Sequence, residues 1–546
     1  MKHQQNEKYR ILCRLFLLIL LVSTGIHSLA QEKVQKNQLK FARLLRIVDG
    51  YYVDSTNVDK ITEDAIVKLL ADLDPHSKYI SKEDVEKMNE PLKGNFEGIG
   101  ISFNIYKDTL LVVSVISGGP SEKVGLHAGD RIVDIDGENI AGTGLKNSDV
   151  FKMLRGQKGT EVNLKVLRRT EPELLDFKII RDKIPIFSLD AAYRLNKTTG
   201  YIKLNKFAAT TYNEFVVAMD KLKQQGIQNL VLDLRGNTGG YLKSAIQISD
   251  QFLKDGQLVV YIEGLHEAKQ EYRASSKGML EKGKLVVLVD ENSASASEIV
   301  SGAVQDWDRG LIVGRRSFGK GLVQKPFMLT DGSMIRLTTA HYHTPSGRCI
   351  QKPYEKGVME YRKDYLNRMS NGEMFNADSI HFDDKLKYKT LENKRNVYGG
   401  GGIIPDIFVP MDTSHYYGYL NKLRRKNVVF TYVLSFVDEN RDEFKQKYPD
   451  FETFNKKFVV TDDVINEIVA RGEKEGVKKN EESLVFVKDM LKQDIKAYIA
   501  RDIFSRSDMY QILNSDDKTL QKALEVIDNP VEYEHLVNST EVVEIR

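Results

Sequence analysis

Serines gathered at the start of an expected helix are the first residues whose types and spacing suggest chemistry. They follow an apolar run, Leu285–Val289, and a short Asp-Glu-Asn turn. The group consists of Ser293, Ser295, Ser297 and Ser301. A serine on the first turn of a helix gains from free N–H groups and the helix dipole, which stabilise negative charge. This favours the first three serines as nucleophiles over the last. Helix capping is the alternative, because Ser295 and Glu298 have the capping-box spacing.

A serine nucleophile needs a base, and the sequence offers two kinds. His341 and His343 follow an expected strand over residues 333–339. Lys320 lies between two glycines in a Phe-Gly-Lys-Gly loop. Lowering a lysine pKa from about 10.4 to about 7 costs about 4.6 kcal/mol, and burial among apolar neighbours can supply that shift. From the residues alone, histidine and lysine both stay open.

Phosphate binding is a rival interpretation of the lysine loop. Gly314 and Lys320 have the Gly-x-x-x-x-Gly-Lys spacing of a P-loop, but Gly321 stands where the motif needs a Ser or Thr hydroxyl. The sequence contains no CxxC pair and no HExxH, so it carries no metal-ligand signal. We therefore expect no metal and no organic cofactor.

The overall composition bounds the class of protein. The chain has 546 residues, too many for one core. Hydrophobic residues make up 41% and charged residues 29%, as in globular domains. With 80 basic and 77 acidic residues, the net charge of +3 argues against a general nucleic-acid-binding surface. The two cysteines, Cys13 and Cys349, give no compartment signal.

The N-terminus predicts secretion. Basic residues precede an apolar run over residues 15–22, and small residues then lead to Ala30. This pattern predicts a signal peptide over residues 1–30, and so a periplasmic or secreted protein. An uncleaved inner-membrane anchor is the alternative, although the run is shorter than the roughly 20 residues of a spanning helix.

The rest of the chain changes character several times, which predicts a multidomain α/β protein. An N-terminal region is expected to be helical, and a glycine-rich region with alternating apolar residues follows it. Strands and helices then alternate in a core that contains a charged insertion, and a charge-rich helical extension ends the chain. The expected boundaries are 31–93 (helical), 94–182 (glycine-rich), 183–413 (α/β core), 353–398 (charged insertion) and 414–546 (helical extension).

The glycine-rich region resembles a PDZ domain. It begins with Gly98, Ile99, Gly100 and Ile101, and later contains Gly-Asp-Arg-Ile and Ile-Asp-Gly. Glycines let successive backbone N–H groups converge on a carboxylate, and the adjacent strand edge pairs with an extended peptide. These four residues are therefore the expected peptide-binding loop. A glycine turn in an ordinary small barrel is the alternative.

Several motifs together resemble the carboxyl-terminal processing proteases, also called tail-specific proteases. They are Ser-Ala-Ser-Ala-Ser-Glu from Ser293, Phe-Gly-Lys-Gly from Phe318, Asp-Leu-Arg-Gly-Asn from Asp233, Thr-Pro-Ser-Gly-Arg from Thr344 and the Gly-Gly-Ile motif from Gly401. The resemblance covers about residues 35–410 and leaves out the helical extension. It implies a ClpP/crotonase-like protease core with an inserted PDZ-like domain.

The resemblance also implies roles for individual residues. Ser295 matches the family nucleophile and Lys320 the family base, which together form a serine–lysine dyad. Gln324 matches a glutamine that holds the lysine in the active form. Asp306 matches an acid tied to the integrity of the site. The histidines at 341 and 343 receive no role from the resemblance.

The oxyanion hole is expected from the N–H group of Ala296 and one N–H group of the glycine turn. Gly239 and Gly240 are the two candidates in that turn. Thr238 stands where the family more usually has proline or glycine, which leaves the choice between the two amides open.

By resemblance, the protein is expected to be a serine endopeptidase that recognises C-terminal regions of protein substrates through its PDZ-like domain. Its expected partners are unfolded polypeptides or C-terminal tails and no nucleic acid, and a homodimer and an adaptor protein stay open. One alternative is a serine hydrolase that uses a histidine base. Another is a non-catalytic PDZ scaffold that recruits polypeptide tails.

Overall fold

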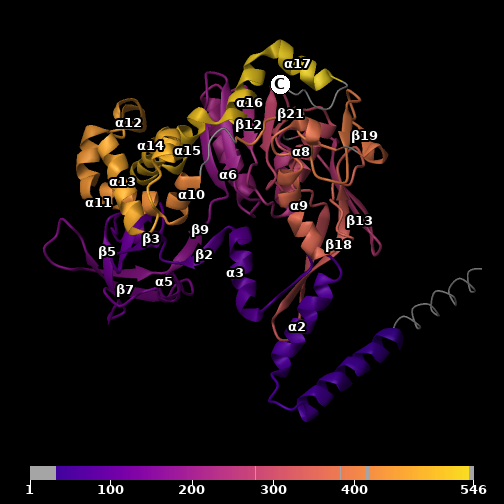
Figure 1. Cartoon of the computed structure of the whole chain (residues 1–546), viewed down its shortest axis with the longest axis horizontal. Coiled ribbons are helices and arrows are strands. Elements are labelled where there is room, and N and C mark those ends of the chain that lie inside the picture. The colour runs from indigo at the N-terminus through magenta and orange to yellow at the C-terminus, as the bar shows by residue number, and fades with distance from the viewer. Residues whose placement is uncertain (1–31, 277, 382, 413–417, 540–546) are drawn as a thin grey trace, which may run out of the picture. The chain divides into compact units, whose positions relative to one another are not determined.

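The computed structural model describes residues 32–276, 278–381, 383–412 and 418–539 (Figure 1). The predicted signal peptide lies outside the described residues. Contacts along the chain divide it into two units, Met1–Leu73 and Asp74–Arg546. Among the described helices, none is long and apolar enough to cross a lipid bilayer.

The first unit is helical where it is described. Residues 32–51 form one helix, and α2 (Val58–Ala71) follows. Asn57 begins α2, because its side chain accepts the Lys60 N–H at 3.0 Å and so caps a free donor of the first turn.

The second unit opens with a turn in place of helix. The Asp74 carboxylate accepts the N–H groups of His76 and Ser77 at 2.7 and 2.8 Å, and proline at 75 disfavours helix in the residue before it. The chain then forms the strand β1 (Lys78–Ile80) before α3 (Lys82–Lys93). The expected helical region therefore contains a short strand that the apolar pattern did not indicate.

An antiparallel sheet with one helix packed against it forms the glycine-rich region. The sheet has the strand order β3-β4-β5-β7-β8, with β6 paired to β5, while β2 pairs with β9. The elements are β2 (Asn95–Gly98), β3 (Ile101–Tyr106), β4 (Thr109–Val115), α4 (Pro120–Lys123), β5 (Arg131–Ile135), β6 (Glu138–Asn139), α5 (Asn147–Leu154), β7 (Glu161–Leu167), β8 (Leu175–Ile180) and β9 (Asp182–Pro185). Alternate residues of β4 face the α5 side, where Leu110 and Val112 pack with Val150 in one core.

A mostly parallel sheet forms the centre of the α/β core, in the order β10-β11-β12-β15-β16-β21. Its strands are β10 (Leu189–Arg194), β11 (Thr199–Leu204), β12 (Asn229–Asp233), β15 (Leu285–Val289), β16 (Leu311–Gly314) and β21 (Ile407–Phe408). Every pair from β11 to β21 is parallel, and β10 is antiparallel. Strand β15 is buried along its whole length, which explains its unbroken apolar sequence.

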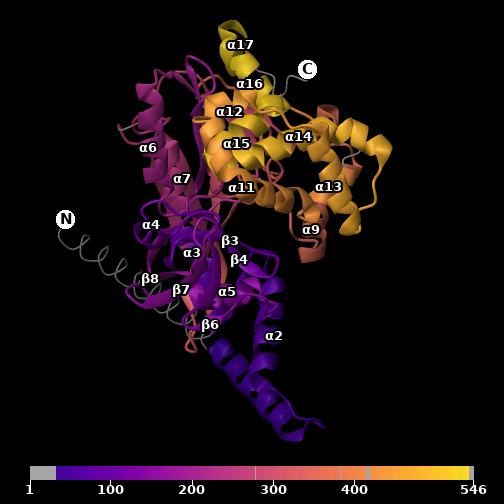
Figure 2. The ribbon, with the colours of Figure 1, turned by 90° about the vertical axis from the view of Figure 1, so that its left-hand side faces the viewer.

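Helices and a second sheet cover one face of the parallel sheet. The helices are α6 (Thr211–Gln224), α7 (Leu242–Ser249) and α8 (Ala296–Asp306), and their apolar residues share one core with those of the sheet. Helices α6 and α7 pack against each other and are both labelled in Figure 2. The second sheet has the order β1-β18-β13-β14, with β17 paired to β18. Its remaining strands are β13 (Leu258–Gly264), β14 (Glu267–Arg273), β17 (Leu322–Met328) and β18 (Met334–His343).

The opposite face of the parallel sheet is covered from the C-terminal part of the chain. Helices α16 (Lys518–Asp528) and α17 (Pro530–Asn538) pack Leu520, Ile527 and Leu536 against the sheet residues Val231 and Leu288. Figure 1 shows these helices in yellow over the strands of the core. This part of the helical extension therefore belongs to the core of the α/β fold.

The other helices of the extension form a bundle with its own apolar core. They are α10 (Gly418–Arg425), α11 (Val428–Lys447), α12 (Phe451–Lys457), α13 (Asp462–Lys474), α14 (Glu481–Ile503) and α15 (Arg506–Leu513). Leu434 of α11 packs against Leu111 and Val113, which point away from the α5 side of β4. An ion pair of 2.6 Å joins Arg131 to Asp438 beside this contact.

The expected charged insertion over residues 353–398 contains regular structure. It holds α9 (Val358–Ser370), two short 3₁₀ turns (Ala377–Ser379 and Asp384–Leu386), and the paired strands β19 (Lys387–Lys389) and β20 (Asn396–Tyr398). Arg368 of α9 is 2% exposed, so part of the charge of this segment faces inward.

We predict that Leu520→Ala destabilises the protein by about 2–5 kcal/mol, because it leaves a cavity between α16 and the sheet. Val531→Ala, at an 80% exposed position of α17, is the matched control and is expected to change stability by less than about 0.5 kcal/mol. Urea unfolding of both variants measures the difference. Equal midpoints would show that α16 does not stabilise the sheet.

Candidate active site

Ser295 occupies the turn between β15 and α8 in an unusual backbone conformation. Its φ is 57° and its ψ is −113°, a region that residues other than glycine rarely adopt. Such strain persists only where surrounding contacts impose it, and it often marks a functional site. Here the N–H of Ser295 donates to the Glu298 carboxylate at 2.8 Å, and the N–H of Glu298 donates to the Ser295 carbonyl oxygen at 2.9 Å.

The hydroxyl groups distinguish Ser295 from the other serines of the group. Ser293 donates to the carbonyl oxygen of Leu234 at 2.9 Å, and Ser297 donates to that of Asn237 at 2.8 Å. Ser301 donates to the carbonyl oxygen of Ser297 at 2.8 Å. The Ser295 side chain makes no cap hydrogen bond, because the Glu298 N–H donates to the backbone carbonyl oxygen of Ser295 and only the Glu298 half of the capping box is formed. Within the described residues, the three other hydroxyl groups therefore have structural partners, and none is found for the Ser295 hydroxyl.

The glycine turn after β12 lies directly against the Ser295 turn. A Cβ atom on Gly239, whose φ is 97°, would lie 2.8 Å from the Ser295 Cβ, so only glycine fits there. The Gly239 N–H is already used, since it donates to the Asn237 Oδ1 at 2.9 Å. In the described part of the chain, no hydrogen bond is recorded for the N–H groups of Gly240 and Ala296.

The lysine loop is joined to the Ser295 turn through the carboxylate of Glu298. That carboxylate accepts the Ser317 hydroxyl at 2.5 Å and the N–H groups of Gly319 and Lys320 at 2.7 and 2.9 Å. Burial raises the pKa of Glu298, while these donors and the Ser295 N–H favour its charged form. Glu298 thus fixes the backbone of both candidate catalytic residues.

Lys320 is well suited to act as a base. Burial, and then the positive charge of Arg336, lowers the pKa of Lys320 to about 8, although the charge of Glu298 opposes this change. A substantial fraction of the amine is therefore neutral in mildly alkaline solution. Lys320 is half-buried as a residue, and the burial of its amine is the largest cause of the lowered pKa.

A cavity of about 740 Å³ brings most of the expected site residues together. It is lined by Ser295, Ala296, Gly239, Gly240, Lys320 and Gln324, among other residues. It opens at the carboxyl ends of β12 and β15, where parallel α/β sheets usually bind ligands. The serine and the lysine thus reach one cavity from opposite ends of the same segment.

Gln324 lines this cavity, but its recorded partner is not Lys320. The Gln324 Nε2 donates to the Thr338 hydroxyl at 3.2 Å, and that hydroxyl donates to the Asp74 carboxylate at 3.1 Å. The role of Gln324 in holding the lysine therefore stays a prediction.

Asp306 lies at the far end of α8 from Ser295 and does not line the cavity. Its carboxylate accepts the Ser346 N–H at 2.9 Å and pairs with Arg348 at 2.7 Å. These contacts hold the Thr-Pro-Ser-Gly-Arg loop against α8. Its contribution is to the packing around the site, at a distance from the reacting atoms.

The two candidate histidines lie outside the cavity. His343 stacks on Tyr261 with ring centroids 4.7 Å apart, and His341 is exposed. Both are one residue away from Tyr342, which lines the cavity, so their side chains point to the other face of β18. This geometry disfavours a histidine base for Ser295.

The phosphate alternative also lacks its structural context. A P-loop leads from a strand into a helix, whereas the lysine loop leads from β16 into the strand β17. Within the described residues there is no group of three or more His, Cys, Asp or Glu side chains that could hold a metal ion.

The expected peptide-binding loop lies at the start of β3. Strand β3 is at the edge of its sheet as described, and Phe103 on it contacts Phe151 of α5 with ring centroids 5.3 Å apart. Gly100 has a φ of 80°, which suits glycine. Gly98, Ile99 and Ile101 complete the loop between β2 and β3. An open strand edge beside a helix is the geometry that binds an added peptide strand.

Sequence reasoning missed two groups of residues that support the site. The first is Tyr342, whose hydroxyl donates to the carbonyl oxygen of Ser295 at 3.2 Å. The second is α9, from which Arg368 donates to the carbonyl oxygens of Ser317 and Phe318 at 2.8 and 3.4 Å. An unusually long charged segment was the only signal for α9, and it was interpreted as an insertion.

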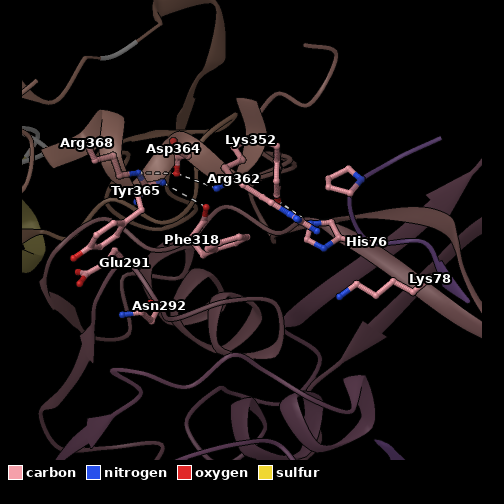
Figure 3. A pocket seen from close by; sticks show the side chains of 12 residues that line it. His76, Lys78, Glu291, Asn292, Phe318, Lys352, Arg362, Asp364, Tyr365 and Arg368 are labelled. Carbon is pink, nitrogen blue, oxygen red and sulfur yellow. Dashed lines mark hydrogen bonds and ion pairs between the residues drawn. The ribbon is translucent and has the colours of Figure 1, made fainter. Parts of the chain in front are cut away.

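A second cavity, of about 320 Å³, lies between α9 and the lysine loop (Figure 3). In it the Lys352 ammonium lies 3.9 Å from the ring centroid of Phe318 and pairs with Asp364 at 2.9 Å. His76 contacts Tyr361 at 2.8 Å, and burial, followed by the charge of Lys320, lowers the pKa of His76 to about 4. His76 is therefore neutral at physiological pH and packs behind the lysine loop.

The site and the fold together define a PDZ-bearing α/β protein with a serine and a buried lysine in one cavity. Comparison with protein families agrees: residues 198–359 match peptidase family S41, and residues 98–179 match the PDZ domain. Residues 419–505, which contain most of the helical bundle but not α15, match a family of unknown function (DUF8443).

Individual relatives extend this result. The chain is 35% identical to a carboxy-terminal-processing protease of Bartonella bacilliformis over 337 residues, which are 61% of this chain and 77% of that protein. It is 31% identical to the carboxy-terminal processing protease CtpB of Bacillus subtilis over 416 residues, 76% of this chain and 82% of the relative. Among solved structures, a photosystem II D1 C-terminal processing protease is 31% identical, with 57% of this chain and 89% of that chain covered and a TM-score of 0.32.

The chain therefore belongs to the carboxyl-terminal processing proteases of peptidase family S41. It combines the serine-peptidase core of that family with a PDZ domain and a helical C-terminal region.

We predict that Arg368→Met lowers kcat for peptide hydrolysis by roughly tenfold or more, because the carbonyl groups before Lys320 lose their buried donor. Arg362→Met is the matched control, since Arg362 lies on the same helix but is exposed. A continuous peptide-cleavage assay measures both variants, with thermal unfolding to verify the fold. Equal kcat values would show that α9 does not position the loop.

Proposed function

We propose that this protein is an endopeptidase that cleaves polypeptides with a Ser295–Lys320 dyad and recognises their C-terminal regions through the PDZ domain. One observation carries the proposal. Ser295, in a strained conformation, and Lys320, with a pKa lowered to about 8, line the same cavity. A serine and a partly neutral amine that line one cavity supply the nucleophile and the base that such catalysis requires.

In the proposed mechanism, neutral Lys320 accepts the proton of the Ser295 hydroxyl as the oxygen attacks the peptide carbonyl. The protonated lysine then gives this proton to the leaving amine, and an acyl-enzyme remains. Water, deprotonated by the neutral lysine, hydrolyses the ester and restores the serine. The fixed backbone around Glu298 keeps the two side chains in place, so little reorganisation accompanies each step.

We assign the oxyanion hole to the N–H groups of Ala296 and Gly240. The Gly239 N–H is occupied by Asn237, which supports Gly240 as the second donor. Two fixed N–H groups stabilise the developing oxyanion, and the loss of one such donor typically costs about 10²–10³ in rate.

The PDZ domain supports a polypeptide substrate with an accessible tail. An extended C-terminus would add a strand to the free edge of β3, with its carboxylate at the loop Gly98–Ile101. We place this reaction outside the cytoplasm, in the periplasm or after secretion, on the basis of the N-terminal sequence.

Replacing either member of the dyad is expected to reduce kcat by about 10³-fold or more, as for other nucleophile and base substitutions. The variants are Ser295→Ala and Lys320→Ala, tested on an unstructured peptide with a free C-terminus. Ser301→Ala is the control, because Ser301 lies on the same helix and only donates to the Ser297 carbonyl. Equal cleavage by wild type and Ser295→Ala would favour the scaffold, whereas loss of activity only in His341→Ala would favour a histidine hydrolase.

The pH profile should report the lysine. Because only neutral Lys320 accepts the proton, kcat/KM should rise with pH through about 8 and fall about tenfold per pH unit below it. Stopped assays from about pH 6 to about pH 9.5 measure this limb. A constant kcat/KM over that range would contradict a lysine base.

A further inference from the structure

One wall of the catalytic cavity is formed by the hairpin of β17 and β18. Alternate residues of a strand point to the same face, and here the cavity-facing residues are Gln324, Pro326 and Met328 on β17 and Met334 and Arg336 on β18. The register pairs Pro326 with Arg336 and Met328 with Met334. Arg336 is therefore a charged residue in a row that otherwise consists of neutral side chains.

The positive charge of the cavity is not balanced by acidic residues in its wall. Lys93, Lys320 and Arg336 line it, and no Asp or Glu is among its described lining residues. In the part of the chain that the structure describes, no ion pair or side-chain hydrogen bond is recorded for Arg336. The nearby Glu298 carboxylate is already occupied by backbone N–H groups and the Ser317 hydroxyl.

A second cation lies directly across the strand pair from Arg336. Lys78 of β1 is its register partner, so the two side chains leave the same face of the sheet. Lys78 lines the neighbouring cavity behind the lysine loop (Figure 3). Like charges placed opposite each other destabilise a strand pair, and an anion that binds beside them removes part of that cost.

Asp74 does not compensate these charges fully. Its carboxylate accepts two backbone N–H groups and the hydroxyls of Ser77 and Thr338. These bonds hold the turn before β1 against β18. The hairpin therefore presents an arginine without a recorded acidic partner to a cavity that opens next to Ser295.

We propose that Arg336 binds a carboxylate of the polypeptide substrate inside the catalytic cavity. The protein then favours cleavage near an acidic side chain or near a free C-terminal carboxylate. Arginine suits this role because its planar fork of N–H donors matches the two oxygens of a carboxylate. Pro326 and Met328, which are exposed side chains of the same wall, place apolar surface beside such a pair. This inference rests on the proposed peptidase function and adds a substrate class to it.

A bound carboxylate would also act on the base. The charge of Arg336 helps to lower the pKa of Lys320, and a carboxylate on Arg336 offsets that charge. The pH below which kcat falls should therefore be higher for a peptide with a carboxylate than for its neutral counterpart. The limb of kcat/KM, which reports the free enzyme, should be the same for both peptides.

The experiment uses pairs of fluorogenic peptides that differ only by Glu or Gln at each position within a few residues of the cleaved bond. A further pair differs by a C-terminal acid or amide. Wild type should show roughly tenfold higher kcat/KM for the carboxylate member of at least one pair, the size expected for a charge-assisted hydrogen bond. In Arg336→Gln this ratio should fall to about one, and Arg336→Lys should retain part of it.

Lys325→Gln is the matched control, because it removes the same charge from the same hairpin. Lys325 points away from the cavity and pairs with Glu267 at 2.8 Å, so the ratio should persist in this variant. A kcat/KM ratio above one in a Glu/Gln pair identifies a side-chain carboxylate as the group that Arg336 binds. A ratio above one only in the acid/amide pair, and lost in Arg336→Gln, identifies the C-terminal carboxylate. A preference due to the PDZ domain would remain in Arg336→Gln.

Binding to the Ser295→Ala protein separates recognition from catalysis. Fluorescence anisotropy should give a lower Kd for the carboxylate peptide, and Arg336→Gln in the same background should remove the difference. A carboxylate preference that persists unchanged in Arg336→Gln, or equal kcat/KM and Kd within every peptide pair, overturns the inference. Binding with this preference but without Ser295-dependent cleavage overturns only the proposed function.

Discussion

The buried carboxylate of Glu298 is the interaction on which the site depends. It accepts N–H groups from the Ser295 turn and from the lysine loop, two segments that follow the neighbouring strands β15 and β16 of the parallel sheet. A buried charge is tolerated only when its oxygens are well supplied with donors. Because those donors are the backbone of the candidate nucleophile and base, the contacts that satisfy the charge also fix the reacting groups. The positive φ of Ser295 persists for the same reason.

Much of this arrangement could be predicted from local sequence. The strands β11, β15 and β7 coincide with the apolar or alternating runs at Thr199–Leu204, Leu285–Val289 and Glu161–Leu167. Buried parallel strands give unbroken apolar runs, and half-buried strands alternate. The fold class and the family followed from the motifs that connect these strands.

The roles of individual side chains could not be predicted from local sequence, because they depend on contacts between distant segments. That Ser293 and Ser297 are structural became clear only from their bonds to the carbonyl groups of Leu234 and Asn237. The support from Arg368 was hidden because its helix has a polar sequence, and charged side chains are rarely buried. The Gly239 N–H donates to the Asn237 side chain, a partner that periodicity does not reveal.

The cover that α16 and α17 provide has a consequence for the biogenesis of the enzyme. Residues 518–538 are translated after every strand of the parallel sheet, yet they bury one of its faces. Until they emerge, Val231, Leu288 and their neighbours on that face lack the apolar cover of α16 and α17. The chain therefore acquires a fully covered sheet late in synthesis, and an unfinished chain offers an exposed apolar surface that chaperones can hold.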